Sequence, residues 1–363
     1  MLFRSGELFG NGTLTQTGGG RLTLAGDGSP FAGTYALNSG GFTLNNALGS
    51  TLGPCSLGIS RGSTFGGNGQ LVGSLTLQGD GSGFAGSVEV PIAKTLQLDN
   101  RLGDTSAPCS VVVDPGGLVT GGGTLVGTLT NQGTLSPGNS PGTMNVVGSY
   151  TQTAAATYTA EIASASSYDK IAVTGTPGTA SLAGTLAPVL LGGYQPLRNT
   201  VFADVVTATG GVTGTFGTIS KQQITPVLSW QPRYNATSVD LVAAADFAPA
   251  GLPLTGNQRH VGTMLNGLNA INGGDLGQVL NTISQLPTGA AVADAYQQIS
   301  PDKASALPAL SLAGSMMQWQ SVANRLSYQR WRQGGMPNMA AGRSGSFNLS
   351  YNSLAGLMLA YNG

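Results

Sequence analysis

Two stretches of this sequence match each other closely and decide its fold class. The first is Gly20–Ser50, GRLTLAGDGSPFAGTYALNSGGFTLNNALGS, and the second is Gly73–Asp104, GSLTLQGDGSGFAGSVEVPIAKTLQLDNRLGD. A third copy starts at Gly127 with GTLTNQGTL and departs from the pattern at Ser136. The chain therefore carries an internal repeat of about 54 residues, which is typical of a stacked architecture.

Each copy consists of short alternating segments such as LTL, TYAL, FTL, LQL and SVVV, separated by Gly, Asn, Asp or Pro. Strands this short cannot bury a face alone, but the coils of a solenoid bury theirs against the coils above and below. The pattern predicts a mainly β fold, a right-handed parallel β-helix, with glycine at its corners. A β-sandwich also has many short strands and is the alternative, although it does not need repeats in sequence order.

The composition excludes several classes of protein. Glycine supplies 58 of 363 residues, charged residues only 8%, and the formal net charge is zero. A collagen needs glycine near one third, and a disordered chain needs low hydrophobicity with high net charge. The 15 basic residues are balanced by 15 acidic ones, so a nucleic-acid partner is not expected. The first ten residues, MLFRSGELFG, lack the apolar core of a secretory signal peptide.

The two cysteines, Cys55 and Cys109, are 54 residues apart and hold equivalent places in successive repeats. In a solenoid we expect them to lie above one another, separated by two or three coils, roughly 10 to 14 Å. A disulfide needs Cα atoms within about 7 Å. The sequence therefore predicts two reduced, buried thiols.

A longer motif begins at Gly133 and includes SPGNSPGT, a strand ending in TAEI, SSYDKIAVTGT, LAGTL and GGVTGTF. This order of motifs resembles the C-terminal end of an autotransporter passenger, the exported part of a type V secretion protein. The resemblance implies a stalk over residues 1–134 and a passenger folding segment, similar to an autochaperone, over residues 135–248. In that family the folding segment forms first and the coils above it follow.

The pattern changes near residue 249 from strand-like to helical. Apolar residues recur at helix spacing in Met264–Ile271 and Leu276–Ile283, and Pro308 should break or restart a later helix. The segment from AYQQISPDK to LSYQRW resembles the helical linker that precedes the autotransporter translocator. The resemblance implies a linker over residues 249–335 and a remnant of the first barrel strands over residues 336–363.

In that family the last helix threads the outer-membrane β-barrel, which is therefore the implied partner and which this chain lacks. Arg325, Arg330 and Arg332 would be available to face the barrel lumen. Some members cleave themselves at paired asparagines in this helix, whereas this chain has only Asn324 there. The resemblance places the full-length protein at the outer membrane, on the cell surface or outside the cell, with host or cell-surface ligands as further partners.

No residue of the sequence qualifies as a catalytic, metal or cofactor site. Ser140 lies in a G-x-S-x-G pattern, but Pro141 follows it and has no N–H for an oxyanion hole. Asp27 and Asp80 supply one carboxylate per repeat, too few for Ca²⁺, and are interpreted as solvated turn residues. His260, the single histidine, has no His or Cys companion nearby.

The predicted function is that of a non-catalytic passenger stalk, which supports the display and folding of a distal domain, with adhesion as an additional role. Two alternatives remain, a carbohydrate-active β-helix enzyme and a ligand-binding β-solenoid with a flat threonine face. A charged cleft would favour the enzyme and a regular plane of threonines the binder. The pairs Thr13-Thr15, Thr15-Thr17 and Thr128-Thr130 do not recur at a fixed coil period.

Overall fold

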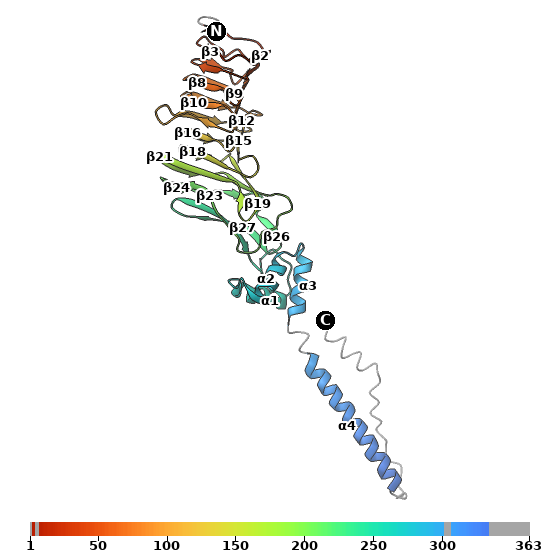
Figure 1. Cartoon of the computed structure of the whole chain (residues 1–363). Helices are drawn as coiled ribbons and strands as arrows, with labels where there is room; N and C mark the ends of the chain where they lie inside the picture. The colour runs from red at the N-terminus through yellow and green to blue at the C-terminus, as the bar shows by residue number, and fades with distance from the viewer. Residues whose placement is uncertain (1, 4–6, 301–305, 334–363) are drawn as a thin grey trace. The chain divides into compact units, whose positions relative to one another are not determined.

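The computed structural model describes residues 2–3, 7–300 and 306–333. The chain divides into two compact units, Met1–Ser300 and Pro301–Gly363. The first unit is mainly β, and the strands are joined by pairings that are mostly parallel (Figure 1). Within these residues, four helices follow the strands. The mainly β fold class is therefore confirmed, with the helices at the C-terminal side.

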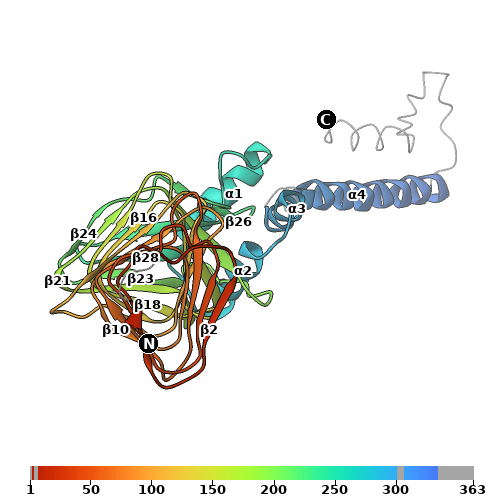
Figure 2. The same cartoon turned by 90° about the horizontal axis from the view of Figure 1, so that it is seen from above.

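In the described part of the chain, the parallel pairings form three stacks, which the chain visits in turn. Viewed from the N-terminal end, successive passes of the chain overlie one another (Figure 2). The first stack contains β2 (Thr13–Gln16), β4 (Thr34–Leu37), β7 (Cys55–Ile59), the second half of β9 (Gln70–Leu77), β12 (Thr95–Leu98), β15 (Leu118–Gly121), β17 (Thr134–Pro137), β19 (Thr157–Ser164), β22 (Thr185–Leu190) and β25 (Thr218–Ile219).

The other two stacks have the same parallel pairing. The second contains β1 (Leu2–Phe3), β3 (Arg21–Leu24), β5 (Gly41–Leu44), β8 (Thr64–Gly67), β10 (Asp80–Phe84), β13 (Arg101–Leu102), the first halves of β16 (Thr124–Asn131), β18 (Thr143–Gln152) and β21 (Lys170–Leu182), and β23 (Val201–Ala208). The third contains β6 (Ala47–Leu48), the first half of β9, β11 (Ser87–Val90), β14 (Cys109–Val113), the second halves of β16, β18 and β21, and β24 (Gly211–Gly214).

The sequence repeat does not match a whole number of passes through the three stacks. One repeat holds eight strand segments: the second half of β9, then β10, β11, β12, β13, β14, β15 and the first half of β16. Eight is not a multiple of three, so equivalent residues move to a different stack in the next repeat. Cys55 begins β7 in the first stack, whereas Cys109 begins β14 in the third. The expectation that they lie above one another is therefore wrong, although both are buried as predicted.

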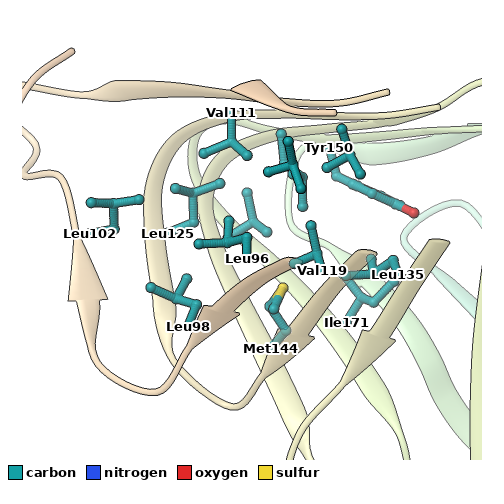
Figure 3. Packing of buried hydrophobic residues seen from close by; sticks show 14 of the residues in the cluster. Leu96, Leu98, Leu102, Val111, Val119, Leu125, Leu135, Met144, Tyr150 and Ile171 are labelled. Atoms are coloured by element: carbon teal, nitrogen blue, oxygen red, sulfur yellow. The ribbon is translucent and has the colours of Figure 1, made fainter. Parts of the chain in front are cut away.

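One continuous hydrophobic core runs along the interior of the stacks (Figure 3). In the first stack each inward residue is paired with the next through the whole stack: Leu14, Tyr35, Leu57, Leu75, Leu96, Val119, Leu135, Tyr158, Leu186 and Ile219. In the second stack, Phe42, Phe65 and Phe84 stack with ring centroids 6.0 Å and 4.4 Å apart. Burying one such side chain stabilises the fold by about 1.5 to 3 kcal/mol. The stacked side chains therefore supply the hydrophobic burial that a short strand cannot provide alone.

The C-terminal end of the stacks is covered by antiparallel strands. β23 pairs with β28 (Ser238–Ala245), β28 with β27 (Leu228–Tyr234), and β27 with β26 (Gln223–Thr225). A short strand, β20 (Ser167–Tyr168), also pairs antiparallel with β19. The segment from β18 onward therefore changes from parallel stacking to an antiparallel sheet at its end.

Three helices pack against this antiparallel sheet: α1 (Gly256–Gly267), α2 (Gly274–Ser284) and α3 (Gly289–Ile299). Thr255 and Gln258 form a capping box at the start of α1, which satisfies backbone N–H groups there. A second core joins Leu265, Leu280 and Tyr296 of the helices to Val227 and Phe247 of the strand region. These helices accordingly belong to the first compact unit.

The second unit contains α4 (Ala306–Gln333). The sequence predicted that Pro308 would break or restart a helix, and this helix begins at Ala306, which places Pro308 in its first turn. The first turn of a helix tolerates proline because its missing N–H would have no partner there. The remnant strands expected over residues 336–363 lie outside the described residues.

Candidate functional site

The outer face of the first stack carries a column of hydroxyl groups, which we call the hydroxyl column. Its members are paired strand to strand: Thr13, Thr34, Ser56, Ser74, Thr95, Leu118, Thr134, Thr157, Thr185 and Thr218. Leu118 is the one member without a hydroxyl. Neighbouring strands in a sheet are about 4.8 Å apart, so the hydroxyls repeat at that spacing.

The threonines therefore recur regularly in space although they do not recur regularly in sequence. Successive members are as few as 16 residues apart, between Leu118 and Thr134, and as many as 33, between Thr185 and Thr218. Loops of different length between the strands take up the difference. The irregular spacing of threonines in the sequence argued against a threonine plane. The strand register nevertheless aligns them, because the loops between the strands differ in length.

Most hydroxyls in this column are available to water or a ligand. Ser74 Oγ accepts the Thr95 N–H at 3.1 Å, but within the described residues the hydroxyls of Thr34, Thr134 and Thr157 make no hydrogen bond to the protein. No member of the column is charged. The column can bind a neutral ligand by hydroxyl donors and acceptors, and its members offer no charge for an ionic one.

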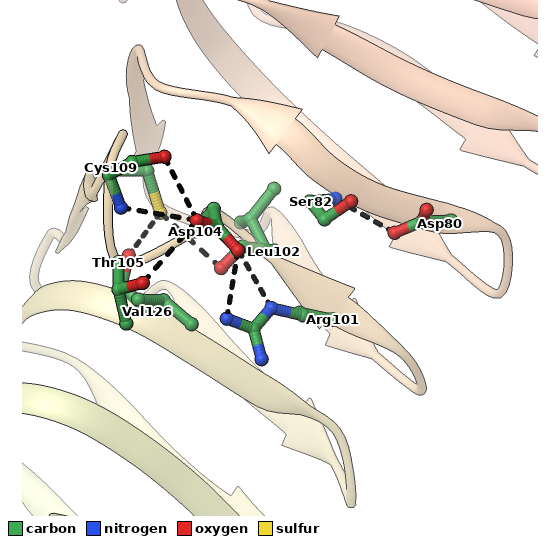
Figure 4. Close-up of polar contacts among 10 residues, drawn as sticks. Asp80, Ser82, Arg101, Leu102, Asp104, Thr105, Cys109 and Val126 are labelled. Carbon is green, nitrogen blue, oxygen red and sulfur yellow. Dashed lines mark hydrogen bonds and ion pairs between the residues drawn. The ribbon is translucent and has the colours of Figure 1, made fainter. Parts of the chain in front are cut away.

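The enzyme alternative requires charged residues gathered in a cleft. Arg101 and Asp104 form an ion pair at 3.2 Å on the surface (Figure 4). Asp104 also accepts hydrogen bonds from Ser106, and these bonds hold the pKa of its carboxyl below the usual value. Its partners belong to one turn, which indicates that the cluster stabilises the loop.

Of the repeat aspartates, Asp27 lies in the connection that follows β3, and Asp80 is the first residue of β10. Asp27 accepts the Ser29 N–H at 2.9 Å, and Asp80 accepts the Ser82 N–H at 2.9 Å (Figure 4). Both side chains are exposed. This pattern is an Asx turn, in which a carboxylate accepts the N–H two residues ahead.

Ser140 lies in a connection between two strands, β17 and β18, and not at a strand-to-helix turn. It is exposed, with φ of 66°, and Pro141 follows it. His260 is an exposed residue of α1. The nucleophile elbow of hydrolases joins a strand to a helix and supplies an N–H after the serine, so this loop lacks both features.

Asp169 has a role that the sequence analysis did not assign. Its buried carboxylate accepts the Gly142 N–H at 2.8 Å and the Glu161 N–H at 3.0 Å. It thereby joins the SPGNSPGT turn, the TAEI strand and the SSYDKIAVTGT segment, the three motifs on which the family resemblance rests. Among the described residues no cation pairs with it, because Lys170 lies over the Tyr168 ring instead, 4.8 Å from its centroid.

Burial raises the pKa of Asp169 to about 6, although the two backbone hydrogen bonds oppose the shift. The folded state therefore binds a proton more tightly than the unfolded chain, whose Asp pKa is about 3.9. The stabilisation of the folded state by this tighter proton binding at Asp169 is present in full below about pH 4 and is lost as the pH rises through about 6.

We expect acidification from pH 7 to pH 5 to raise the melting temperature through Asp169, as measured by circular dichroism. Asp169→Asn should reduce this rise, because the amide does not titrate. Asp27→Asn, at an exposed turn, should leave it unchanged and serves as the control. An identical pH dependence in wild type and Asp169→Asn would contradict the assignment.

Burial also raises the pKa of Cys55 and of Cys109 to about 12. The Cys109 Sγ lies 3.4 Å from the carbonyl oxygen of Val126, inside the core (Figure 4). Since the thiolate is the reactive form, both thiols should resist alkylation at pH 8 in the native protein and react on addition of denaturant. Mass spectrometry of iodoacetamide-treated protein measures this, and rapid modification of either cysteine in the folded state would be the contrary result.

Arg198 is a second residue whose role the sequence did not show. Its side chain is 3% exposed and donates to the carbonyl oxygens of Asn269 and Ile271, between α1 and α2. Arg198 thus fixes the helices to the loop before β23. Among the described residues, no three His, Cys, Asp or Glu side chains are grouped to hold a metal ion.

The sequence matches no model of a known protein family and no curated protein. In the described part of the chain, no helix has the length and apolar character needed to cross a membrane.

Proposed function

We propose that this protein is a non-catalytic passenger stalk of an autotransporter, exported to the cell surface and folded as a right-handed parallel β-helix. The observation that carries the proposal is the unbroken column of inward residues, from Leu14 to Ile219, which the chain builds by visiting three stacks in turn. Parallel strands joined by crossovers are right-handed in nearly all proteins, which supports the handedness.

The segment over residues 135–248 is the proposed folding template for the coils that precede it. Two features support this role: the antiparallel sheet of β26–β28 covers its end, and Asp169 ties three loops and strands of the segment together. A parallel strand needs a formed edge to pair with, and this segment can offer the edge of β17 to β15, which precedes it. Helix α4 is proposed to thread the outer-membrane barrel partner.

Fusion of the chain between a signal peptide and an outer-membrane barrel tests this proposal. We expect the chain to reach the cell surface and to resist added protease there. The same fusion without residues 135–248 should reach the surface with its upstream coils sensitive to protease. Retention of the intact chain inside the cell would contradict the stalk function, and resistant coils in the deletion would contradict the template.

Ligand binding is a second candidate function, favoured by the hydroxyl column. An uncharged column of hydroxyls spaced about 4.8 Å apart suits a neutral polymer that also carries hydroxyls at regular intervals. Sedimentation with an insoluble neutral polysaccharide measures such binding. Thr157→Lys, in the middle of the column, should abolish it, whereas Thr179→Lys in the third stack should not. Equal binding by both variants would contradict a role for this face.

A further inference from the structure

A groove of about 440 Å³ lies on the outer surface where the second stack meets the third. Its floor is formed by β16 and β18, which pair without interruption from Thr124 to Asn131 of β16. Val126, Gly127 and Gly148 are buried where these two strands bend from one stack to the next. The floor is low because both strands turn this corner without a loop.

One wall of the groove is the loop before β14. β13 ends opposite Leu125 and β14 begins opposite Gly127, so only Val126 separates these two positions in β16. Between β13 and β14 the chain uses six residues, 103–108, for the same step. The extra residues protrude from the surface, and Pro108 among them is exposed.

The other wall is a loop inside β21. Val147 and Ser149 of β18 are separated by Gly148 alone, whereas their partners in β21 are separated by four residues, 175–178. Pro177 in this loop is exposed. The strands β14, β16, β18 and β21 are consecutive in the stack, so β14 and β21 are three strand spacings, about 14 Å, apart. The floor between the walls is therefore wide enough for one extended chain.

The groove combines apolar walls with hydroxyl groups, and the described residues that line it carry no charge. The hydroxyls come from Thr105, Thr128, Ser149 and Thr176. Within the described residues, those of Ser149 and Thr176 make no hydrogen bond to the protein. Sites for small molecules are mostly apolar with a few polar groups, and a neutral sugar offers matching apolar ring faces and hydroxyls.

The hydroxyls continue along the strands beyond the walls. Thr128 pairs with Ser149, and two residues further on Thr130 pairs with Thr151 on the same outer face. Two residues of a strand span about 6.7 Å, so pairs of hydroxyls recur at that interval along the direction of the groove. Because this direction is straight, the floor suits a straight polymer and not a coiled one.

We propose that this groove binds one chain of a straight, neutral oligosaccharide of the β-1,4-linked class. The sugar hydroxyls bond to the hydroxyl pairs of β16 and β18, and the apolar ring faces pack against Pro108 and Pro177. The site is separate from the hydroxyl column and does not rest on the proposed stalk function. Its walls keep the packed surface of an insoluble polysaccharide away from the floor and admit a single soluble chain.

Isothermal titration calorimetry of the whole chain with soluble hexasaccharides tests the proposal. Cellohexaose and chitohexaose are straight and neutral, and we expect at least one of them to bind at least tenfold more tightly than maltohexaose, which is curved. Ser149→Val keeps a β-branched side chain in the strand and removes the hydroxyl, so it should weaken that binding about three- to tenfold. Thr159→Val, on the outer side of β19 in the first stack, is the matched control and should bind like wild type. Far-ultraviolet circular dichroism checks that both variants fold.

Four results would overturn the proposal: no binding of either straight hexasaccharide, equal binding of maltohexaose, unchanged affinity in folded Ser149→Val, or an equal loss in Thr159→Val. The last result would place the sugar outside the groove. If Ser149→Val does not fold, Thr176→Val in the loop of β21 replaces it. The same three- to tenfold loss is then expected, and unchanged affinity of Thr176→Val would overturn the proposal.

Discussion

Phe202→Ala should slow refolding by at least about tenfold, if the C-terminal segment forms first. Phe202 is fully buried in β23, the strand where parallel stacking meets the antiparallel sheet. Its ring lies 5.4 Å from that of Tyr168 and 5.6 Å from that of Trp230. Removing a buried phenylalanine side chain costs about 3 to 5 kcal/mol, and in a folding nucleus this loss raises the folding barrier.

Phe42→Ala is the matched control for this prediction. Phe42 is 2% exposed and stacks on Phe65 near the N-terminal end. A residue that becomes ordered late should mainly speed unfolding when truncated, with little change in the refolding rate. Stopped-flow circular dichroism measures both rates. Slow refolding of Phe42→Ala, with normal refolding of Phe202→Ala, would reverse the proposed order of folding.

Gly127→Ala should destabilise the protein by about 3 kcal/mol, because the backbone there accepts no side chain. Gly127 has φ of 140°, and an added Cβ would lie 1.8 Å from the carbonyl oxygen of Cys109. The bend at Gly127 lets β16 leave the second stack and enter the third without a loop. Gly73 has the same conformation at the equivalent position, with φ of 149°.

Gly58→Ala provides the control for the glycine prediction. Gly58 lies on the outer side of β7, and an added Cβ would meet no atom within 4 Å. Alanine there should be neutral or should stabilise by about 0.4 to 1 kcal/mol, since it restricts the unfolded chain. Urea unfolding measures both variants, and equal stability of Gly127→Ala and wild type would show that the bend relaxes.

Much of the local structure could be predicted from the sequence because it depends on neighbouring residues. Alternation in TYAL and FTL predicted strands, and Tyr35, Leu37, Phe42 and Leu44 are all buried. The helical spacing of apolar residues after residue 249 also predicted helices, and α1 and α2 lie there. It did not identify the buried face fully, however, since Leu265 is buried while its neighbour Met264 is 54% exposed. The three helices share one small core, which covers only part of each apolar stripe.

The candidate site was less predictable, because its members are brought together by strand pairing. Thr134 and Thr157 are neighbours on the outer face although 22 residues separate them in the chain. The sequence showed Asp169 only as one residue of the SSYDKIAVTGT motif. Its hydrogen-bond partners, Gly142 and Glu161, come from other segments of the chain. No period in the sequence marks such contacts, because the loops between the strands differ in length.

The sequence by itself determined that this chain is built from short strands, that glycine bends them, and that its two cysteines are buried. These properties follow from alternation, from backbone freedom and from the hydrophobicity of single residues. Only the tertiary structure decided which stack each strand joins and which hydroxyls align. Eight strand segments per repeat distributed over three stacks shift every equivalent residue to a new face, and this relation exists only once the strands have paired.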